Sequence, residues 1–115
     1  QHEGSIAGGI GHTLYEHCIM ENGRTLTPNF SGYGLPTATD VPLEMVSMSI
    51  ESMDSVGAFG AKESGEGTQV STIPAIVNAI HNAVGIWMTE LPVTPEKVLK
   101  ALKALEEKRK GKRGA

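Results

Sequence analysis

Apolar residues recur at four-residue spacing near the start of the chain, at Ile6, Ile10 and Leu14. This spacing places them on one side of a helix and predicts a helix over residues 3–18. Three glycines stand near the opposite side of that helix: Gly4, Gly8 and Gly11. A glycine inside a helix costs up to about 1 kcal/mol relative to alanine, so several together indicate a close neighbour. We expect this helix to be buried on two sides, with packing against another helix favoured over contact with a ligand.

Two further apolar stripes predict helices in the second half of the chain. Ser71 or Thr72 can cap the first of these helices, with Pro74 in its first turn, and Gly85 can end it. Residues 94–95 (Thr-Pro) can cap and open the second. The first stripe consists of Ile73, Ile76, Val77, Ile80, Val84 and Trp87, and the second of Val98, Leu99, Leu102 and Leu105.

Between the predicted helices, apolar residues recur at every second position. Val46, Met48 and Ile50 alternate with polar residues, which predicts a strand with one buried face. Residues 23–42 are rich in proline and glycine and predict an irregular connection with a short strand near residues 24–26. We therefore predict an α+β fold, with two or three helices packed on a short, mainly antiparallel sheet. Residues 1–108 would form this unit, and residues 109–115 a basic disordered tail.

Composition narrows the classes of function. The 115 residues suit one compact domain or one lobe of a larger one, and the net charge of −3 argues against nucleic acid as the main partner. The single cysteine, Cys18, fits a reducing compartment and predicts a cytoplasmic protein. The longest apolar stretch, residues 73–88, is interrupted by polar residues and is not expected to span a membrane. The chain begins with glutamine rather than methionine, which suggests a fragment or a processed product.

The glycine-rich loop over residues 54–72 has the clearest potential for chemistry. Between Gly57 and Gly67 it combines four glycines with Lys62, Glu63 and Glu66. It contains neither a phosphate-binding P-loop nor a dinucleotide fingerprint. Its position before a helix can present backbone N–H groups to an anion, or hold a carboxylate in a cleft. From composition alone, a flexible surface loop with solvated charges is the favoured interpretation.

The histidines near the first helix form a weaker candidate for a metal site. His12 and Glu16 are four residues apart and can share a helix face, whereas His17 and Cys18 point elsewhere. Because a metal site needs three or four convergent ligands, a helix-surface pair and a buried cysteine are favoured over a metal site.

Four short motifs occur along the chain. They are Gln1-His2-Glu3-Gly4 with Gly9-Ile10-Gly11 and Leu14-Tyr15-Glu16; Tyr33, Pro36, Asp40 and Pro42; Gly60-Ala61-Lys62-Glu63-Ser64-Gly65-Glu66; and Ala79-Ile80, Gly85, Glu90-Leu91-Pro92 and Thr94-Pro95-Glu96. In this order they resemble the C-terminal part of the large subunits of molybdenum hydroxylases, the xanthine dehydrogenase and carbon monoxide dehydrogenase family. The resemblance covers nearly the whole chain, and it implies that residues 1–108 are a terminal lobe of a larger cofactor-binding domain. Ser5, Gly8 and Glu63 depart from the family's common residues.

The resemblance implies a cofactor and a catalytic residue. The cofactor would be molybdopterin, in its mononucleotide or dinucleotide form, in an oxidoreductase that hydroxylates or oxidises a small substrate. Glu66 would be the base that acts on a metal-bound hydroxyl, and Gln1, Ser64, Gly65 and Glu66 would contact the cofactor. Aldehydes, purines, N-heteroaromatic acids, aryl-CoA esters and carbon monoxide all remain open as substrates.

The resemblance also implies partners. This segment or small subunit would assemble with the remainder of the large subunit, with an iron–sulfur subunit carrying 2Fe-2S clusters and with an FAD subunit. The assembly itself could form a homodimer. The chain alone would be inactive, and its glycine-lined helix face would be a docking surface. The alternative is a non-catalytic interaction module that keeps the fold, and a nucleic-acid module through the basic tail ranks third.

Overall fold

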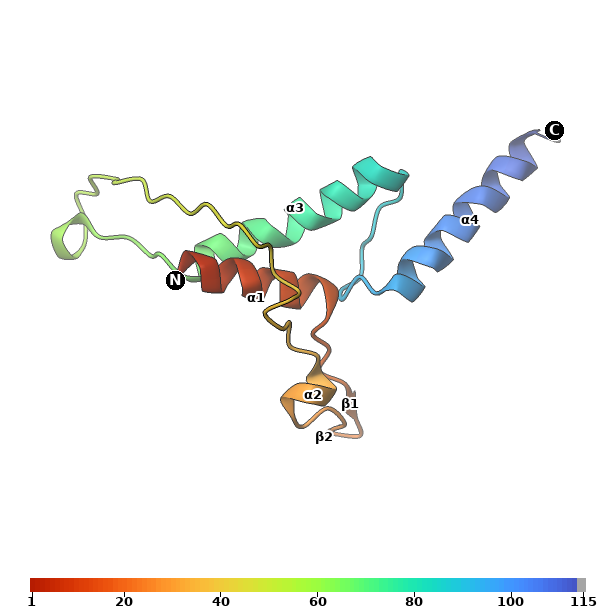
Figure 1. Ribbon diagram of the computed structural model, residues 1–115, viewed down its shortest axis with the longest axis horizontal. Helices are drawn as coiled ribbons and strands as arrows, with labels where there is room; N and C mark the ends of the chain where they lie inside the picture. Colours follow the sequence, from red (N-terminus) through yellow and green to blue (C-terminus); the bar gives the residue numbers. More distant parts are fainter. Residues whose placement is uncertain (114–115) are drawn as a thin grey trace.

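The computed structural model describes residues 1–113 of the chain (Figure 1). Within that range it has helices and one small antiparallel sheet, which confirms the predicted α+β class. In chain order the elements are α1 (His2–Leu14), β1 (Met20–Glu21), β2 (Arg24–Thr25), α2 (Phe30–Tyr33), the 3-10 turn η1 (Ala58–Gly60), α3 (Glu66–Val84) and α4 (Pro95–Arg113).

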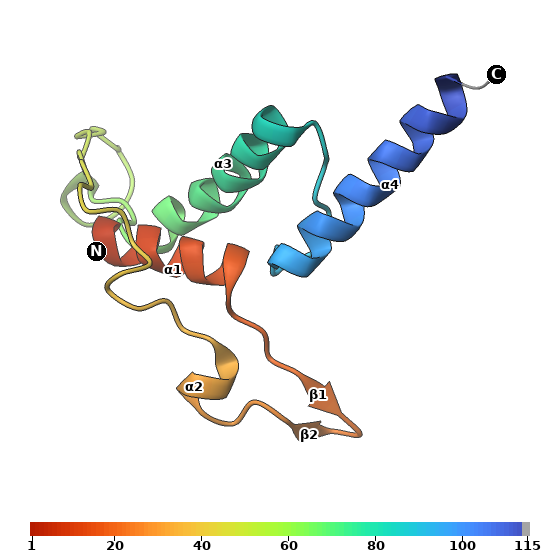
Figure 2. The same ribbon diagram turned by 45° about the vertical axis from the view of Figure 1, so that its right-hand side comes forward.

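Helices α1 and α3 form the main packed pair of the structure, and they lie side by side in both views (Figures 1 and 2). Their closest approach is at Gly9, where an added Cβ would lie 2.6 Å from the Thr72 Cβ and 3.1 Å from the Gln69 carbonyl oxygen. At Gly8, an added Cβ would touch the Gln69 side chain. Gly8 and Gly9 therefore serve helix packing, as expected, because only glycine lets the two backbones come this close. Of the other two predicted glycines, Gly4 has nothing within 4 Å of an added Cβ, and Gly11 faces Glu16 and Pro36. Helix α3 thus covers only part of the face that was predicted to be a docking surface.

The sheet is a two-stranded hairpin that pairs Met20 with Thr25 and Glu21 with Arg24. Asn22 and Gly23 form its turn with φ angles of 48° and 77°. This confirms the short strand predicted near residues 24–26. The predicted packing of helices on the sheet is wrong, because within residues 1–113 the helices pack mainly on each other. All four strand residues are exposed, so the hairpin offers no buried face to a helix.

Helix α3 begins at Glu66, earlier than the predicted start at Ser71 or Thr72. Both of these hydroxyls lie inside the helix and donate to the Thr68 carbonyl oxygen, at 2.9 and 3.1 Å. They therefore satisfy a carbonyl of the preceding turn instead of capping free N–H groups. Gly85 ends the helix in the left-handed conformation, with φ 72°, as predicted.

Helix α4 opens as predicted, with the Thr94 hydroxyl oxygen 3.4 Å from the Lys97 backbone nitrogen at its first turn. It continues beyond residue 108, where a disordered tail was expected to follow, as far as Arg113. Lysine, arginine and glutamate are good helix formers, so a charged sequence can continue a helix without a buried face. Residues 114–115 of the expected tail lie outside the described part of the chain.

The segment predicted as a strand over residues 46–50 is extended but unpaired (Figure 1). Val46, Met48 and Ile50 are 74%, 82% and 92% exposed. The prediction of a strand with a buried face is therefore wrong for this chain by itself, since nothing else in residues 1–113 pairs with the segment. Extended backbone becomes a strand only when a neighbour accepts and donates its hydrogen bonds.

The buried core is small and lies where α1 meets the connection between α3 and α4. Ile10, Ile86 and Val93 are the large apolar side chains buried there, beside Thr13. The Cα radius of gyration is 18.8 Å. A compact domain of this length is expected to have about 13 Å. The chain is therefore far more open than a domain that covers its own apolar surface. Among residues 1–113, every helix is too short or too polar to cross a lipid bilayer.

Candidate functional site

The first turns of α1 and α3 meet through the hydroxyl of Ser5. Its oxygen lies 2.7 Å from the Gln1 carbonyl oxygen and 2.6 Å from the Gly65 carbonyl oxygen. Residue 5 departs from the family's common glycine, and the structure shows that its hydroxyl ties the two helix starts together. Sequence reasoning missed this contact because it joins residues far apart in the chain.

This junction brings the predicted site residues together. The Gln1 side-chain Oε1 lies 3.7 Å from where a Cβ on Gly65 would stand. The Ser64 hydroxyl lies 3.1 Å from Nε2 of His2. Glu66 follows directly as the first residue of α3. His2 was not predicted as a site residue, and its only sequence signal is its place beside Gln1.

The Glu66 carboxylate is exposed at the start of α3. A negative charge is stabilised there because free N–H groups give the beginning of a helix a partial positive charge. Within residues 1–113 no side-chain donor or cation contacts this carboxylate. It is therefore free to meet a group that other polypeptide or a cofactor supplies.

Glu63 has a different role from Glu66. Its Oε2 accepts a hydrogen bond of 3.0 Å from the backbone N–H of Gly67, which caps α3. A Cβ on Gly67 would lie only 2.6 Å from the same oxygen, so glycine leaves room for the cap. Lys62, the neighbour of Glu63, pairs with Asp54 instead, at 3.3 Å.

The loop before α3 is held by this ion pair and by one constrained glycine. Gly60 has φ 71°, and a Cβ there would lie 3.0 Å from the Asp54 carbonyl oxygen. An L side chain would be strained at this angle as well as crowded, so position 60 requires glycine. Asp54 thus contacts both Gly60 and Lys62 across the turn, and the loop lies at the surface, as its composition predicted.

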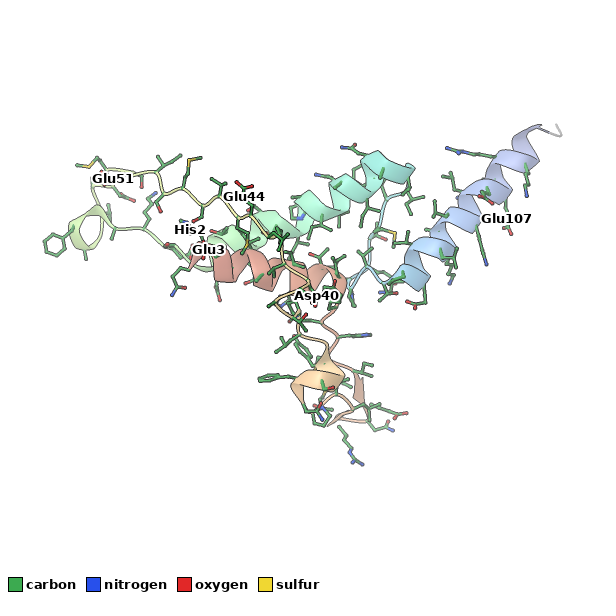
Figure 3. The ribbon with its side chains drawn as sticks, viewed as in Figure 1. His2, Glu3, Asp40, Glu44, Glu51 and Glu107 are labelled. Atoms are coloured by element: carbon green, nitrogen blue, oxygen red, sulfur yellow. The ribbon has the colours of Figure 1, made fainter. Side chains whose placement is uncertain are left out.

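Two open hollows lie on either side of His2 and Ser64. One of about 670 Å³ is lined by these residues, by residues 48–53 and by residues 59–63. The other, of about 440 Å³, is lined by Gln1, His2, Glu3, Ser47, Ser49 and Ser64. Volumes of this order are typical of small-molecule sites. Figure 3 shows His2 and Glu3 at the start of α1, close to the segment that carries Glu44 and Glu51. Glu66 lines neither hollow. It comes two residues after Ser64, which lines both.

A second polar cluster lies at the other end of α1, around Asp40. Thr37 donates to the Asp40 Oδ2 from its backbone nitrogen at 2.7 Å and from its hydroxyl at 2.6 Å. These bonds hold the pKa of Asp40 below its ordinary value. Burial, together with Asp40, raises the pKa of Tyr15. Asp40 lies well apart from His2 (Figure 3). Its hydrogen bonds are to Thr37 and Tyr15 of the same chain, so this cluster stabilises the local fold.

His12 and Glu16 lie close together as predicted, but they do not form a helix-surface pair. The predicted helix over residues 3–18 ends at Leu14, before Glu16, and the Glu16 side chain is only 7% exposed. His12 Nδ1 lies 3.8 Å from Glu16 Oε2, and a hydrogen bond from Tyr33 to Glu16 raises the pKa of that tyrosine. Over residues 1–113, no three side chains of His, Cys, Asp or Glu converge to hold a metal ion. Cys18 is exposed, so the expectation that it would be buried is wrong. It lies just before the hairpin, in a part of the chain that packs against little else.

Comparisons with known proteins show what the chain is similar to. Residues 1–42 match the family model of the molybdopterin cofactor-binding domain. A probable hypoxanthine oxidase of Escherichia coli is 40% identical over 103 residues, which cover 89% of this chain and 11% of that protein. A subunit of a probable xanthine dehydrogenase from Bacillus subtilis is 37% identical over 102 residues, which cover 89% of this chain and 14% of that protein.

A solved structure shares the fold of the segment. The crystal structure of quinoline 2-oxidoreductase from Pseudomonas putida 86 superimposes with a TM-score of 0.75 at 28% identity, over 88% of this chain and 13% of that one. The chain thus spans only 11–14% of the length of these relatives.

Proposed function

Because this chain belongs to the molybdenum hydroxylase family, we propose that it completes the molybdopterin site of an oxidoreductase that hydroxylates or oxidises a small substrate. The observation that carries the proposal is the junction of the two helix starts. There Gln1, Ser64, Gly65 and Glu66, which the family motifs single out, are close neighbours.

The residues at the junction suit a pterin cofactor. The Gln1 amide offers both donors and acceptors, as an edge of a heterocycle requires. Ser64 adds a hydroxyl that can donate or accept, and it lines both hollows. A Cβ on Gly65 would lie 3.3 Å from the Glu63 carboxylate and 3.7 Å from the Gln1 amide oxygen. Glycine at this position therefore keeps the space between them open for close approach of a ligand.

Glu66 is the residue that we assign as the general base. When bound, molybdopterin supplies the redox-active metal centre of the reaction. The Glu66 carboxylate then has one task, which is to accept a proton at its oxygen and release it later to water. An exposed carboxylate at a helix start suits this task, because it is held in place and has no competing side-chain partner in residues 1–111.

The remaining parts of the site must come from other polypeptide. The relatives are seven to nine times longer than the matched segment, from the shares of 14% and 11%. The Bacillus subtilis relative is itself named as one subunit of its enzyme. We propose that the chain works with the remainder of the large subunit and with iron–sulfur and flavin subunits, which would carry electrons away from the site.

The experiment that tests this function is co-purification of the chain with its natural partners, followed by molybdenum and pterin analysis. We expect both in the assembled protein and substantially less in an assembly that carries Gln1→Ala. Asn82→Ala, on the exposed far end of α3, is the control and should retain both. An assembly that lacks molybdenum and pterin with the native chain would contradict the proposal.

A further inference from the structure

The segment over residues 43–53 exposes five large apolar side chains within eleven residues. Leu43, Val46, Met48, Ile50 and Met53 are each between 74% and 108% exposed. A contiguous apolar patch of this kind is uncommon on a protein surface that faces water, and it marks an interaction site. Here it lies on extended backbone, and no backbone hydrogen bond joins residues 46–50 to any other described residue.

One side of this segment already belongs to the chain's own site. Ser47 and Ser49 line the smaller hollow together with Gln1, His2 and Ser64. In extended backbone, neighbouring side chains point to opposite faces. Val46, Met48 and Ile50 alternate with these serines, so their side chains occupy the face opposite the smaller hollow. Met48 and Ile50 also line the larger hollow, which is open, whereas Val46 lines neither. The exposed apolar side chains and the strand edges can thus be covered by a partner.

The central part of the segment, residues 46–50, lacks the features that protect an exposed strand edge. Proteins blunt such edges with charged residues, proline or bulges. Residues 46–50, Val-Ser-Met-Ser-Ile, contain no charge, proline or glycine, and the nearest charges are Glu44 before them and Glu51 after them. A segment of this composition fits a strand that is covered in the working assembly.

The length of the relatives indicates which polypeptide covers residues 46–50 in the assembly. This chain spans 11–14% of them, so most of the large subunit is available to provide a sheet. A second copy of the chain would give only a two-stranded ribbon, which is marginally stable in water. Within residues 1–113 the β1–β2 hairpin already pairs internally, with two residues in each strand.

We propose that residues 46–50 add as a strand to a sheet of the remaining large subunit, through backbone hydrogen bonds and burial of Val46, Met48 and Ile50. This mode of docking gives affinity through the main chain and specificity through alternate side chains. It also fixes Ser47 and Ser49 beside Ser64, so that docking completes the wall of the site. The identity of the occupant rests on the proposed function.

Hydrogen–deuterium exchange of the assembled enzyme, read by mass spectrometry on peptides that cover residues 45–52, tests the strand. We expect the amides of residues 46–50 to exchange at least about 100-fold more slowly than an unstructured peptide. Exchange at the unstructured rate in the assembly would overturn the proposal. Protection that instead rises with the concentration of this chain alone, without the remaining subunit, would identify a second copy as occupant and would also overturn it.

Two matched variants test which face of the strand is buried in the assembly. Met48→Glu places a charge on the apolar face and should weaken association with the remaining large subunit about tenfold or more, because a buried methionine stabilises by about 1.5–3 kcal/mol. Ser47→Glu makes a comparable change on the opposite face and should weaken association much less. Equal association of Met48→Glu and the native chain would overturn the assignment of the face.

These experiments measure how the chain assembles with the remaining large subunit, and their results do not depend on catalytic turnover. If Glu66→Gln kept full activity while Met48→Glu released the chain, the docking strand would stand and the catalytic assignment would fail. If the amides of residues 46–50 were unprotected in an active enzyme that holds molybdenum, the docking strand would fail and the proposed function would stand.

Discussion

The Glu63 carboxylate lies 3.0 Å from the backbone nitrogen of Gly67 and caps α3. This contact gives Glu63 a different role from Glu66, the glutamate on the other side of Gly65. Glu63 is turned back toward the helix start and has its acceptor engaged, whereas Glu66 stands on the first turn without a partner in residues 1–113. Two carboxylates that are three residues apart are therefore expected to respond very differently to substitution.

Glu66→Gln in the assembled enzyme should lower turnover by at least about 100-fold and leave the molybdenum content unchanged. The amide keeps the size of the side chain but does not accept a proton at neutral pH. Steady-state kinetics and metal analysis on the same preparation measure both quantities. Glu63→Gln is the matched control and should have a small effect, because its amide oxygen can still accept from Gly67. The reverse ranking would show that the base is assigned to the wrong residue.

Glu63→Ala should loosen the start of α3 by about 1 kcal/mol, since it removes a cap. The Gly67 amide would then exchange with solvent about fivefold faster, which hydrogen exchange can measure. Lys62→Ala is the control, because Lys62 pairs with Asp54 and not with the helix. Equal exchange of the Gly67 amide in the native chain and in Glu63→Ala would contradict the capping role.

Gly9→Ala should destabilise the pairing of α1 with α3 by about 1–3 kcal/mol. The new methyl group would lie 2.6 Å from the Thr72 Cβ and 3.1 Å from a backbone oxygen, so one helix must move. Gly4→Ala provides the comparison. Nothing lies within 4 Å of that position, and the change should stabilise the helix by up to about 1 kcal/mol. Urea unfolding of the assembled protein compares them, and shifts of the same sign would refute the packing argument.

The turn over residues 37–40 should be stable at neutral pH and open in acid. Hydrogen bonds from Thr37 hold the pKa of Asp40 below its unfolded value of 3.8. A carboxyl with a lowered folded pKa contributes stability above the unfolded pKa and loses it as the pH falls through the folded one. The protection of the Thr37 amide, measured by NMR relative to its intrinsic exchange rate at each pH, should therefore begin to fall only below about pH 3.8. In Asp40→Asn this transition should disappear. A transition that persisted in that variant would belong to another group.

Local features of the fold could be predicted from the sequence because their causes are local. Thr94 and Pro95 start α4, and Gly85 ends α3, where hydrogen bonds within a few residues decide the outcome. Asn22-Gly23 carries an equally local hairpin signal that the sequence analysis did not use. The motif at residues 60–66 also predicted the family that the comparisons confirm.

Contacts between distant residues were decided only by the tertiary structure. Alternation at residues 46–50 predicted a strand, and the segment is extended but unpaired. A strand needs a neighbour to pair with, and residues 1–113 provide none. Residue spacing could not show that Gly9 is the crossing point with Thr72, or that Ser5 joins Gln1 to Gly65. A sequence fixes the hydrogen-bonding and packing capacity of each residue, and three-dimensional packing decides which partner fills it.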